Sequence, residues 1–479
     1  VDLGTLAAPG QGFTITGDGT SFGNAGYSVS GAGDVNGDGV DDLIIGAIRE
    51  GGGAGAAYVI YGVAGGSLDI DLAAFSSGQG FAINGVAADD LAGYSVSGAG
   101  DVNNDGYDDV IVGARDNDSA GTQSGAAYVV YGGPAVGVSV DLATITPPQG
   151  FAISGPAGGA AAGFSVSGAG DVNDDGFDDV IVGAPFVDTA YIVYGGGSGL
   201  IALSSLSAGE GAVLTSGGRF SGVAVASAGD VNDDGIEDVI IGASGNDDGG
   251  FFAGKAFVLY GTAGGFGASV DLSALSLAEG FSIQGGAAGD VLGRSVAGGI
   301  DVNADGVDDV IVGAPDAFAD LGGAYVIYGT AGGGSDVDLA TFATTQGYAI
   351  QGTSDSNAGF SVDRAGDVDG DGIDDVIIGA FGTDVLFTDD GAAHVVYGDP
   401  SLTGVNLGAL PSTQGFSITR ELNRDQVGWS VAGVGDVNGD RIADVIVGVP
   451  SNDDTGSQSG AAYVIYGQRP NQAVVRDGT

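Results

Sequence analysis

Seven short acidic loops carry the residues whose types and spacing could do chemistry. In one of them, Asp101–Asp109, oxygen-bearing side chains occupy positions 1, 3, 5 and 9, and Gly106 stands at position 6. A glycine there permits the positive φ of a sharp turn, and the residue at position 7 can present its backbone carbonyl. Several oxygens around one tight turn hold hard cations such as Ca²⁺. The loop therefore predicts a calcium site.

The loop recurs seven times, at steps of 59 to 71 residues. No helical pattern flanks it and a strand begins at position 10, which excludes an EF-hand. A metal-free hairpin turn rich in Asp, Asn and Gly is the alternative. We expect up to seven Ca²⁺ ions, one per repeat, with side chains at positions 1, 3, 5 and 9 and the carbonyl at position 7 as ligands. The predicted ligands are Asp34, Asn36, Asp38, Val40, Asp42; Asp101, Asn103, Asp105, Tyr107, Asp109; Asp171, Asn173, Asp175, Phe177, Asp179; Asp230, Asn232, Asp234, Ile236, Asp238; Asp301, Asn303, Asp305, Val307, Asp309; Asp367, Asp369, Asp371, Ile373, Asp375; and Asp436, Asn438, Asp440, Ile442, Asp444.

Two loops depart from the pattern. The seventh has Arg441 at position 6 and Ala443 at position 8. A residue with a side chain at positive φ is strained, so we expect this site to be the weakest. The sixth has Asp369 where the others have Asn, and the extra charge predicts tighter binding.

The repeat around each loop predicts the fold. Every copy offers four strand candidates, which in the second copy are Ser-Val-Ser-Gly, Asp-Val-Ile-Val-Gly, Ala-Tyr-Val-Val-Tyr and Phe-Ala-Ile. A long period with strands inside it indicates a propeller, and four strands match one blade. The Asp-Val-Ile-Val-Gly run is apolar without alternation, so it should be buried on both faces. We therefore predict an all-β, seven-bladed propeller of four-stranded blades.

The two chain ends predict how the ring closes. A strand candidate, Phe13–Thr16, precedes the first acidic loop, and the last repeat stops at Ala461–Tyr466 without a fourth strand. The N-terminal strand can complete the last blade and remove its open edge. We expect one propeller domain over residues 1–467 and a C-terminal tail or linker over 468–479.

Composition restricts the partners. The net charge is −51, and the seven loops hold 30 of the 62 acidic residues. Seven Ca²⁺ ions would still leave −37, which argues against nucleic acid and anionic membranes as partners. No apolar run reaches the roughly 18 residues of a membrane helix, so we expect no membrane insertion. Sites of modest affinity fill where calcium is millimolar, so we expect a secreted or cell-surface protein.

The motifs resemble a known family. Gly-Phe/Tyr-Ser-Val, then Asp-x-Asn-x-Asp-Gly-x-x-Asp, then Val-Ile-Val-Gly-Ala-Pro is similar to the FG-GAP repeat of the integrin α-subunit propeller. Gly163-Phe164 shows the first part, and Gly183-Ala184-Pro185 the last. The resemblance implies calcium in loops on one face and partner binding mainly on the other. A metal loop in every blade looks more like the bacterial secreted members.

One residue of each first strand predicts a second feature, a ring near the central axis. Its members are Tyr27, Tyr94, Phe164, Val223, Arg294, Phe360 and Trp429. In integrins, as the resemblance implies, equivalent aromatic residues receive a basic residue of the partner subunit. Here Arg294 could stack on its own neighbours. An apolar plug that closes the channel mouth is the alternative.

These features favour a calcium-binding extracellular propeller for adhesion or surface assembly. It would bind a protein or glycan on the face opposite the calcium loops, as part of a larger chain or surface assembly. A calcium-dependent polysaccharide lyase or hydrolase is one alternative, and a spacer module of a giant secreted protein is another. With one His, His394, and no Cys, catalytic triads are poorly supplied, and we expect no enzyme.

Overall fold

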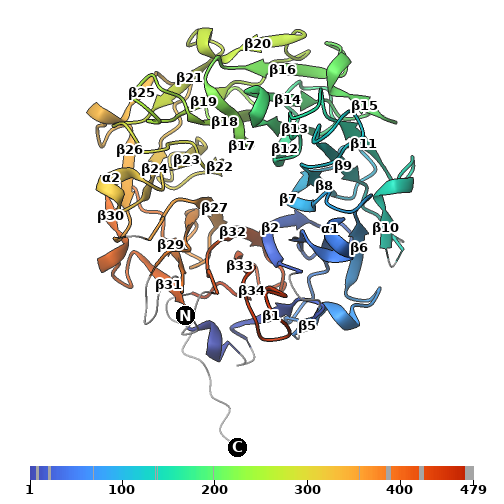
Figure 1. Cartoon of the computed structure of the whole chain (residues 1–479). Coiled ribbons are helices and arrows are strands. Elements are labelled where there is room, and N and C mark those ends of the chain that lie inside the picture. The colour runs from blue at the N-terminus through green and yellow to red at the C-terminus, as the bar shows by residue number, and fades with distance from the viewer. Residues whose placement is uncertain are drawn as a thin grey trace, which may run out of the picture.

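The computed structural model is a ring of seven β-sheets around a central channel, and the chain follows the ring in order (Figure 1). It describes residues 1–469 apart from 7–9, 20–22, 68, 135, 138, 198, 355, 384–389 and 420–424. The predicted seven-bladed propeller is therefore confirmed. The expected tail, 468–479, lies outside the described residues except for Gln468 and Arg469, and the domain boundary stays a prediction.

Each blade contains the four antiparallel strands that its repeat predicts. The innermost strands, which line the channel, are β2 (Ala25–Gly33), β7 (Ala92–Gly100), β12 (Ser165–Gly170), β17 (Arg219–Gly229), β22 (Val296–Ile300), β27 (Ser361–Gly366) and β32 (Ser430–Gly435). The second strands are β3 (Asp42–Ala47), β8 (Asp109–Ala114), β13 (Asp179–Ala184), β18 (Asp238–Gly245), β23 (Asp309–Gly313), β28 (Asp375–Ala380) and β33 (Asp444–Val449). The third strands are β4 (Ala56–Ile60), β9 (Ala126–Val130), β14 (Thr189–Val193), β19 (Lys255–Leu259), β24 (Gly323–Ile327), β29 (Ala392–Val396) and β34 (Ala461–Ile465). The outer strands are β6 (Gly80–Asn84), β11 (Gly150–Ser154), β16 (Gly211–Thr215), β21 (Gly280–Gln284), β26 (Gly347–Gln351), β31 (Gly415–Thr419) and, for the seventh blade, β1 (Gly12–Thr16).

The second strands form the core, as their continuous apolar runs predict. Every residue of β8 is buried, and such strands lie between the two neighbouring blades. The blades approach so closely that a side chain at Gly113 would overlap the carbonyl oxygen of Gly163 in the next blade. The glycine in the Val-Gly-Ala segment therefore sets the spacing between blades.

Six blades have a fifth, parallel strand that the sequence analysis missed. After its third strand, the chain crosses to the outer edge of the preceding blade, pairs there, and returns as the outer strand of its own blade. For example, Val140 pairs with Ile83 of the preceding blade. These strands are β5 (Ile70–Asp71), β10 (Ser139–Asp141), β15 (Ile201–Ala202), β20 (Ser269–Asp271), β25 (Val337–Asp338) and β30 (Val405–Asn406).

The N-terminal segment closes the ring at two blades. The strand β1 pairs antiparallel with β34, with Phe13 opposite Val464 and Ile15 opposite Ala462. The predicted closure is therefore present. In addition, Asp2 forms a parallel bridge with Thr419, whose N–H donates to the carbonyl of Val1 at 3.0 Å. The sixth blade thus receives its fifth strand position from the beginning of the chain.

Helical segments are short and lie in the connections. A 3₁₀ turn follows most of the fifth strands, and the Asp or Asn before it usually caps it, as Asp141 does by accepting from Ala143 N–H. The 3₁₀ turns are Leu3–Thr5, Leu72–Ala74, Leu142–Thr144, Pro185–Val187, Leu203–Ser205, Leu272–Ala274, Leu339–Thr341 and Leu407–Ala409, and the α-helical turns are α1 (Glu50–Gly53) and α2 (Ala317–Asp320). In the described part of the chain, no helix has the length and apolarity needed to cross a membrane.

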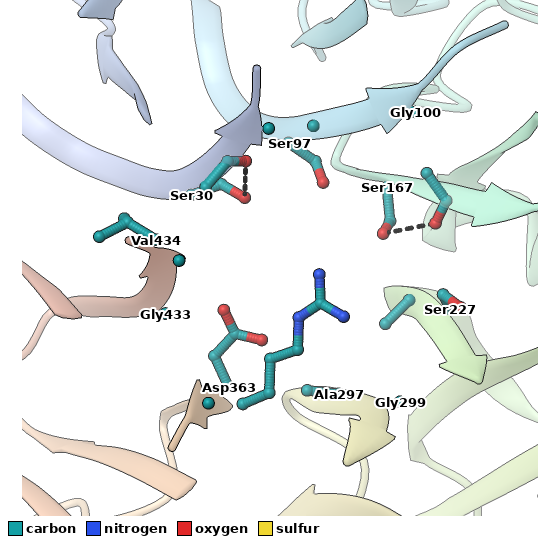
Figure 2. A pocket seen from close by; sticks show the side chains of 18 of the residues that line it. Ser30, Ser97, Gly100, Ser167, Ser227, Ala297, Gly299, Asp363, Gly433 and Val434 are labelled. Atoms are coloured by element: carbon teal, nitrogen blue, oxygen red, sulfur yellow. Dashed lines mark hydrogen bonds between the residues drawn. The ribbon is translucent and has the colours of Figure 1, made fainter. Parts of the chain in front are cut away.

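Serine, glycine and alanine form most of the channel wall, which encloses about 590 Å³. The hydroxyls of Ser30 and Ser167 donate to the carbonyls that follow them, at 3.0 and 2.8 Å (Figure 2). In the sixth blade, Asp363 and Arg364 replace the Ser-Gly pair of the first three blades. Asp363 points into the channel (Figure 2), which therefore holds an acid and a base at a place where those blades have neither.

His394 lies in the core of a third strand and predicts acid sensitivity. Burial lowers its pKa from 6.5 to about 4, and its Nδ1 lies 2.9 Å from Ser417 Oγ. The native state therefore holds the neutral ring, whereas the unfolded chain takes up a proton below pH 6.5. The resulting stability is present above pH 6.5 and falls by about 1.4 kcal/mol per pH unit between 6.5 and 4.

We expect His394→Tyr, which restores the residue of most other third strands, to remove this part of the acid sensitivity. Denaturant unfolding at pH 7 and pH 5, at equal calcium, measures the difference between the two proteins. An identical loss of stability in both would show that His394 is not the group responsible.

Candidate metal centre

In each acidic loop, the position-1 carboxylate accepts hydrogen bonds from backbone N–H groups later in the same loop, which stabilises the turn. Asp34 Oδ1 accepts hydrogen bonds from the N–H groups of Gly37 and Asp38 at 2.8 and 3.0 Å, and its Oδ2 accepts from Gly39 at 2.8 Å. The other six position-1 aspartates accept in the same way from the N–H groups of positions 5 and 6. All seven loops are thus folded around their first predicted ligand.

The carboxylates at positions 5 and 9 are also held by backbone N–H groups. Asp105 Oδ1 accepts from Tyr107 at 3.2 Å. Asp109 is fully buried, and its two oxygens accept from Val102 at 3.0 Å and from Gly132 at 2.8 Å. A carboxylate has about four acceptor sites, so each retains lone pairs that a cation can use.

The buried position-9 carboxylates carry the strongest electrostatic signal. Burial raises the pKa of each to about 8, and the other acids of the loop add to the rise, while backbone hydrogen bonds oppose it. These residues are Asp42, Asp109, Asp179, Asp238, Asp309, Asp375 and Asp444. A nearby cation favours the ionised form, so the all-oxygen donor set fits a hard divalent ion such as Ca²⁺.

The sixth loop brings its acids closest together. Asp367, Asp369 and Asp375 place carboxylate oxygens within 4.8 Å of one another, and no other group of three acids in the described residues does so. Elsewhere position 3 is Asn, and the amide of Asn173, for example, donates to Asp179 at 3.0 Å. Asp at position 3 therefore places one more carboxylate in the loop where the other loops have a hydrogen-bonding amide, which makes this loop the best-formed candidate.

The seventh loop keeps its turn despite Arg441. This residue has φ of 69°, whereas the glycines at position 6 have φ of 85–92°. Its N–H still donates to Asp436 Oδ2 at 2.7 Å, as Gly106 does to Asp101 at 2.8 Å. The arginine is therefore held in the left-handed region that favours glycine. That this site is the weakest stays a prediction.

We expect Arg441→Gly to tighten the seventh site by about 1 kcal/mol, because it relieves the strained backbone. Arg441→Ala is the matched control, since it removes the guanidinium but keeps a Cβ at positive φ. Calorimetric calcium titration of the three proteins separates the two effects. Equal tightening in both variants would assign the effect to charge, and weaker binding in Arg441→Gly would show that the arginine supports the site.

The acid at position 8 has a place that the sequence analysis did not foresee. Asp108 reaches from the second loop to the first, where its Oδ2 accepts from the N–H of Asp34 at 2.7 Å. The same bond between adjacent blades is made by Asp41, Asp108, Asp178, Asp308 and Asp374. The Asp-Asp pair at positions 8 and 9 is visible in the sequence, but its contact with another blade is not.

Arg469 is a second residue that the sequence analysis missed. It follows the last strand and lies against the sixth loop, where a side chain at Gly370 would meet it. The preceding Gln468 N–H donates to the carbonyl of Val368 at 2.8 Å. A positive charge therefore stands beside the loop that has the most closely spaced carboxylates.

Comparison with known proteins agrees with this geometry. The FG-GAP repeat model matches residues 25–60, 92–130, 162–203, 292–328 and 427–465. Five of the seven blades therefore carry an FG-GAP repeat. The two unmatched repeats are the fourth, which has Val223 in the ring, and the sixth, which has Asp363 and Arg364 in the channel.

The FG-GAP propeller is similar to integrin α subunits. It is 33% identical over 170 residues to integrin alpha-V of Gallus gallus, which is 35% of this chain and 15% of that protein. It is 31% identical over 251 residues to integrin alpha pat-2 of Caenorhabditis briggsae, which is 47% of this chain and 18% of that protein. The match to integrin alpha-6 of Gallus gallus covers 31% of this chain and 12% of that protein. The chain thus spans less than a fifth of the length of these relatives.

The innermost strands of the propeller bring the predicted ring residues together at one mouth of the channel. All seven, Tyr27, Tyr94, Phe164, Val223, Arg294, Phe360 and Trp429, line the same cavity. Centroids of adjacent aromatic rings are 5.0–5.6 Å apart for Tyr27–Tyr94, Tyr94–Phe164, Tyr27–Trp429 and Phe360–Trp429. The ring stands where the innermost strands begin, and the acidic loops stand where these strands end. The two features therefore occupy opposite faces of the FG-GAP propeller.

Two arginines of the chain itself stack on this ring. Arg294 Cζ lies 4.2 Å from the ring centroid of Phe360. Arg115 Cζ lies 4.1 Å from that of Tyr94 and 5.5 Å from that of Phe164. The stacking of Arg294 was expected from the sequence, whereas that of Arg115, which comes from the connection after β8, was not. The two guanidinium groups therefore cover ring faces of Phe360, Tyr94 and Phe164.

An aromatic row continues from the FG-GAP ring over the third and fourth blades. Its members are Phe186, Phe220, Phe251 and Phe252, and centroids of neighbours from Phe164 onward are 4.8–6.4 Å apart. Phe186 and Phe251 are 55% and 70% exposed. The connections between second and third strands carry both residues, on the face opposite the acidic loops.

Proposed function

We propose that this FG-GAP chain is a non-enzymatic, calcium-binding extracellular propeller that binds a protein or glycan partner through the face with the aromatic row. One observation carries the proposal: seven metal-type loops and an exposed aromatic row occupy opposite faces of one rigid ring. The similarity to integrin α subunits supports adhesion or protein binding, at the cell surface or in a secreted assembly.

Calcium would be held by the loops that the geometry has described. Positions 1, 3, 5 and 9 supply side-chain oxygens and position 7 a carbonyl oxygen, around a turn that is already formed. The ion would supply the positive charge that the buried position-9 carboxylates otherwise lack. The backbone N–H groups of each loop already orient the carboxylates that would bind the ion.

Native mass spectrometry in calcium acetate counts the bound ions. We expect up to seven per chain, with the last one retained at low free calcium in the sixth loop. The variant Asp369→Asn, which gives the sixth loop the usual residue, should lose that preference without losing the ion at high calcium. A protein that binds no calcium at millimolar concentration would overturn this part of the proposal.

The partner surface is argued from exposed aromatic side chains. Phe186 and Phe251 are large, apolar and exposed on connections held by a rigid scaffold, where binding residues are frequently found. Asp188 lies two residues after Phe186, and Asp247 lies four residues before Phe251. Aromatic faces bordered by hydrogen-bonding side chains suit a sugar or a protein loop with apolar and basic residues.

Binding to arrays of glycans and of cell-surface proteins tests this surface. We expect Phe186→Ser together with Phe251→Ser to abolish whatever binding the natural chain shows. Leu277→Ser is the matched control, because Leu277 is 55% exposed but precedes an outer strand, at the other end of the blade. Equal loss in the control, or no loss in the double variant, would place the partner elsewhere.

A second candidate function, a polysaccharide lyase or hydrolase, has one observation in its favour. Asp363, whose pKa burial raises to about 6, stands next to Arg364 in the channel and away from the metal loops. A carboxyl group titrating near neutral pH can transfer protons. Depolymerisation of an acidic polysaccharide that is lost in Asp363→Asn would favour this candidate, and an absence of turnover would leave the binding function.

A further inference from the structure

A reciprocal pair of hydrogen bonds joins adjacent acidic loops. The N–H of Asp34, at position 1 of the first loop, donates to Asp108 Oδ2 at 2.7 Å. The N–H of Asp108, at position 8 of the second loop, donates to the carbonyl of Asp34 at 3.4 Å. We call this pair the loop clamp. Both backbone groups of one predicted ligand are therefore bound by a residue of the next blade.

The full loop clamp occurs at four junctions. Its pairs are Asp436–Asp41, Asp34–Asp108, Asp101–Asp178 and Asp301–Asp374. At a fifth junction, Asp308 accepts from the N–H of Asp230 at 2.8 Å. A glycine precedes the position-1 residue at most junctions, and a side chain at Gly33 would overlap the Asp108 carboxylate. Space for the clamp is therefore built into the end of the first strand.

The position of the clamp residue connects two metal loops directly. Asp108 stands between Tyr107, a predicted carbonyl ligand, and Asp109, a predicted carboxylate ligand. An ion that fixes these two residues also fixes Asp108, and through it the backbone of Asp34 in the neighbouring loop. The neighbour then has less conformational freedom to lose when it binds its own ion, which is a source of positive cooperativity.

We propose that the position-8 carboxylates couple the metal loops, so that calcium fills the ring cooperatively rather than site by site. Coupling between binding sites is reciprocal, so each clamp acts in both directions around the ring. This inference rests on the proposed calcium binding and concerns residues that are not themselves predicted ligands.

Among the described residues, two junctions lack the side-chain bond of the clamp. Between the third and fourth loops the position-8 residue is Glu237, and neither of the two clamp bonds joins it to Asp171. Between the sixth and seventh loops the position-8 residue is Ala443, and only its N–H bond to the carbonyl of Asp367 remains, at 3.1 Å. The Cβ of Ala443 faces Gly366, which leaves space there for a carboxylate. The ring of coupled loops is therefore open at both junctions. We expect the least dependence between the third and fourth sites, followed by the sixth and seventh sites.

Three variants of the full chain test the coupling. Asp108→Ala removes the clamp acceptor between the first and second loops, Asp108→Asn keeps an acceptor oxygen but removes the charge, and Ala443→Asp adds the missing carboxylate. Asp89→Asn, an exposed residue outside the loops, is the control for charge. A calcium titration monitored by native mass spectrometry shows whether partly loaded species accumulate. Amide hydrogen exchange measures how well the N–H of Asp34 is protected.

We expect the natural chain to pass from few to many ions with little intermediate loading. Asp108→Ala should raise the half-saturating free calcium of the first two sites about tenfold, populate partly loaded species and speed exchange of the Asp34 amide. Asp108→Asn should behave much like the natural chain, and Ala443→Asp should steepen the titration. If the natural chain binds calcium but Asp108→Ala titrates as the control does, the coupling is wrong and the calcium function stands. If Asp108→Asn fails as Asp108→Ala does, charge and not the clamp is responsible.

Discussion

Excess EDTA is expected to lower the melting temperature of the protein by about 10 °C or more. Each site stabilises the native state by about 2.7 kcal/mol when free calcium is 100 times the dissociation constant, and seven sites are predicted. Removal also leaves 30 acids crowded on one face, where they repel one another. Differential scanning calorimetry with and without EDTA measures the shift.

Two controls separate ion binding from charge screening. Calcium added back in excess should restore the original melting temperature, whereas sodium chloride at equal ionic strength should restore only part of it, because salt screens exposed charges without entering the loops. A melting temperature that does not change in EDTA would contradict the calcium assignment for all seven loops.

Deletion of residues 1–17 is expected to cause the second large effect, aggregation at room temperature. The truncation exposes the edge of β34 over its whole length, and Phe13 and Ile15 no longer cover the core of the seventh blade. An open apolar strand edge is a template for pairing with other chains. Size-exclusion chromatography and thermal unfolding compare the truncated and natural chains.

A peptide with the sequence of residues 1–17 serves as the rescue control. Added in excess, it should bind the open edge, return the truncated chain to the monomer position and raise its melting temperature. A truncated chain that stays monomeric and equally stable without the peptide would show that β1 does not hold the ring closed.

The sequence predicted most of the fold because its repeats are local and in phase. Four strands per blade follow from apolar runs such as Val110–Val112, and closure follows from the unpaired run at Phe13. The fifth strands were missed because two or three residues give no periodicity. Their signal was nevertheless present, since Val-Asp-Leu recurs at Val140 and at Val337, and also opens the chain.

The candidate sites were predicted unevenly for a related reason. Position-1 and position-9 acids could be assigned because spacing within one loop determines their place. The contacts of Asp108 and Arg115 join different blades, so no spacing in the sequence reveals them. Arg115 was visible only as a departure from Gly-Ala-Pro, and Asp108 only as one half of an acidic pair.

The fifth strands link the outer edge of six blades to the next blade, and this affects how the ring unfolds. Each blade depends on the next for its outermost strand, and the sixth depends on the first residues of the chain. Unfolding of one blade would therefore remove the outermost strand of the preceding blade and interrupt the closed ring. A solenoid can fray from its terminal repeats, but a closed ring has no terminal blade from which unfolding could begin. We expect protease to find no stable fragment of a few blades, so that the molecule persists whole or is digested completely.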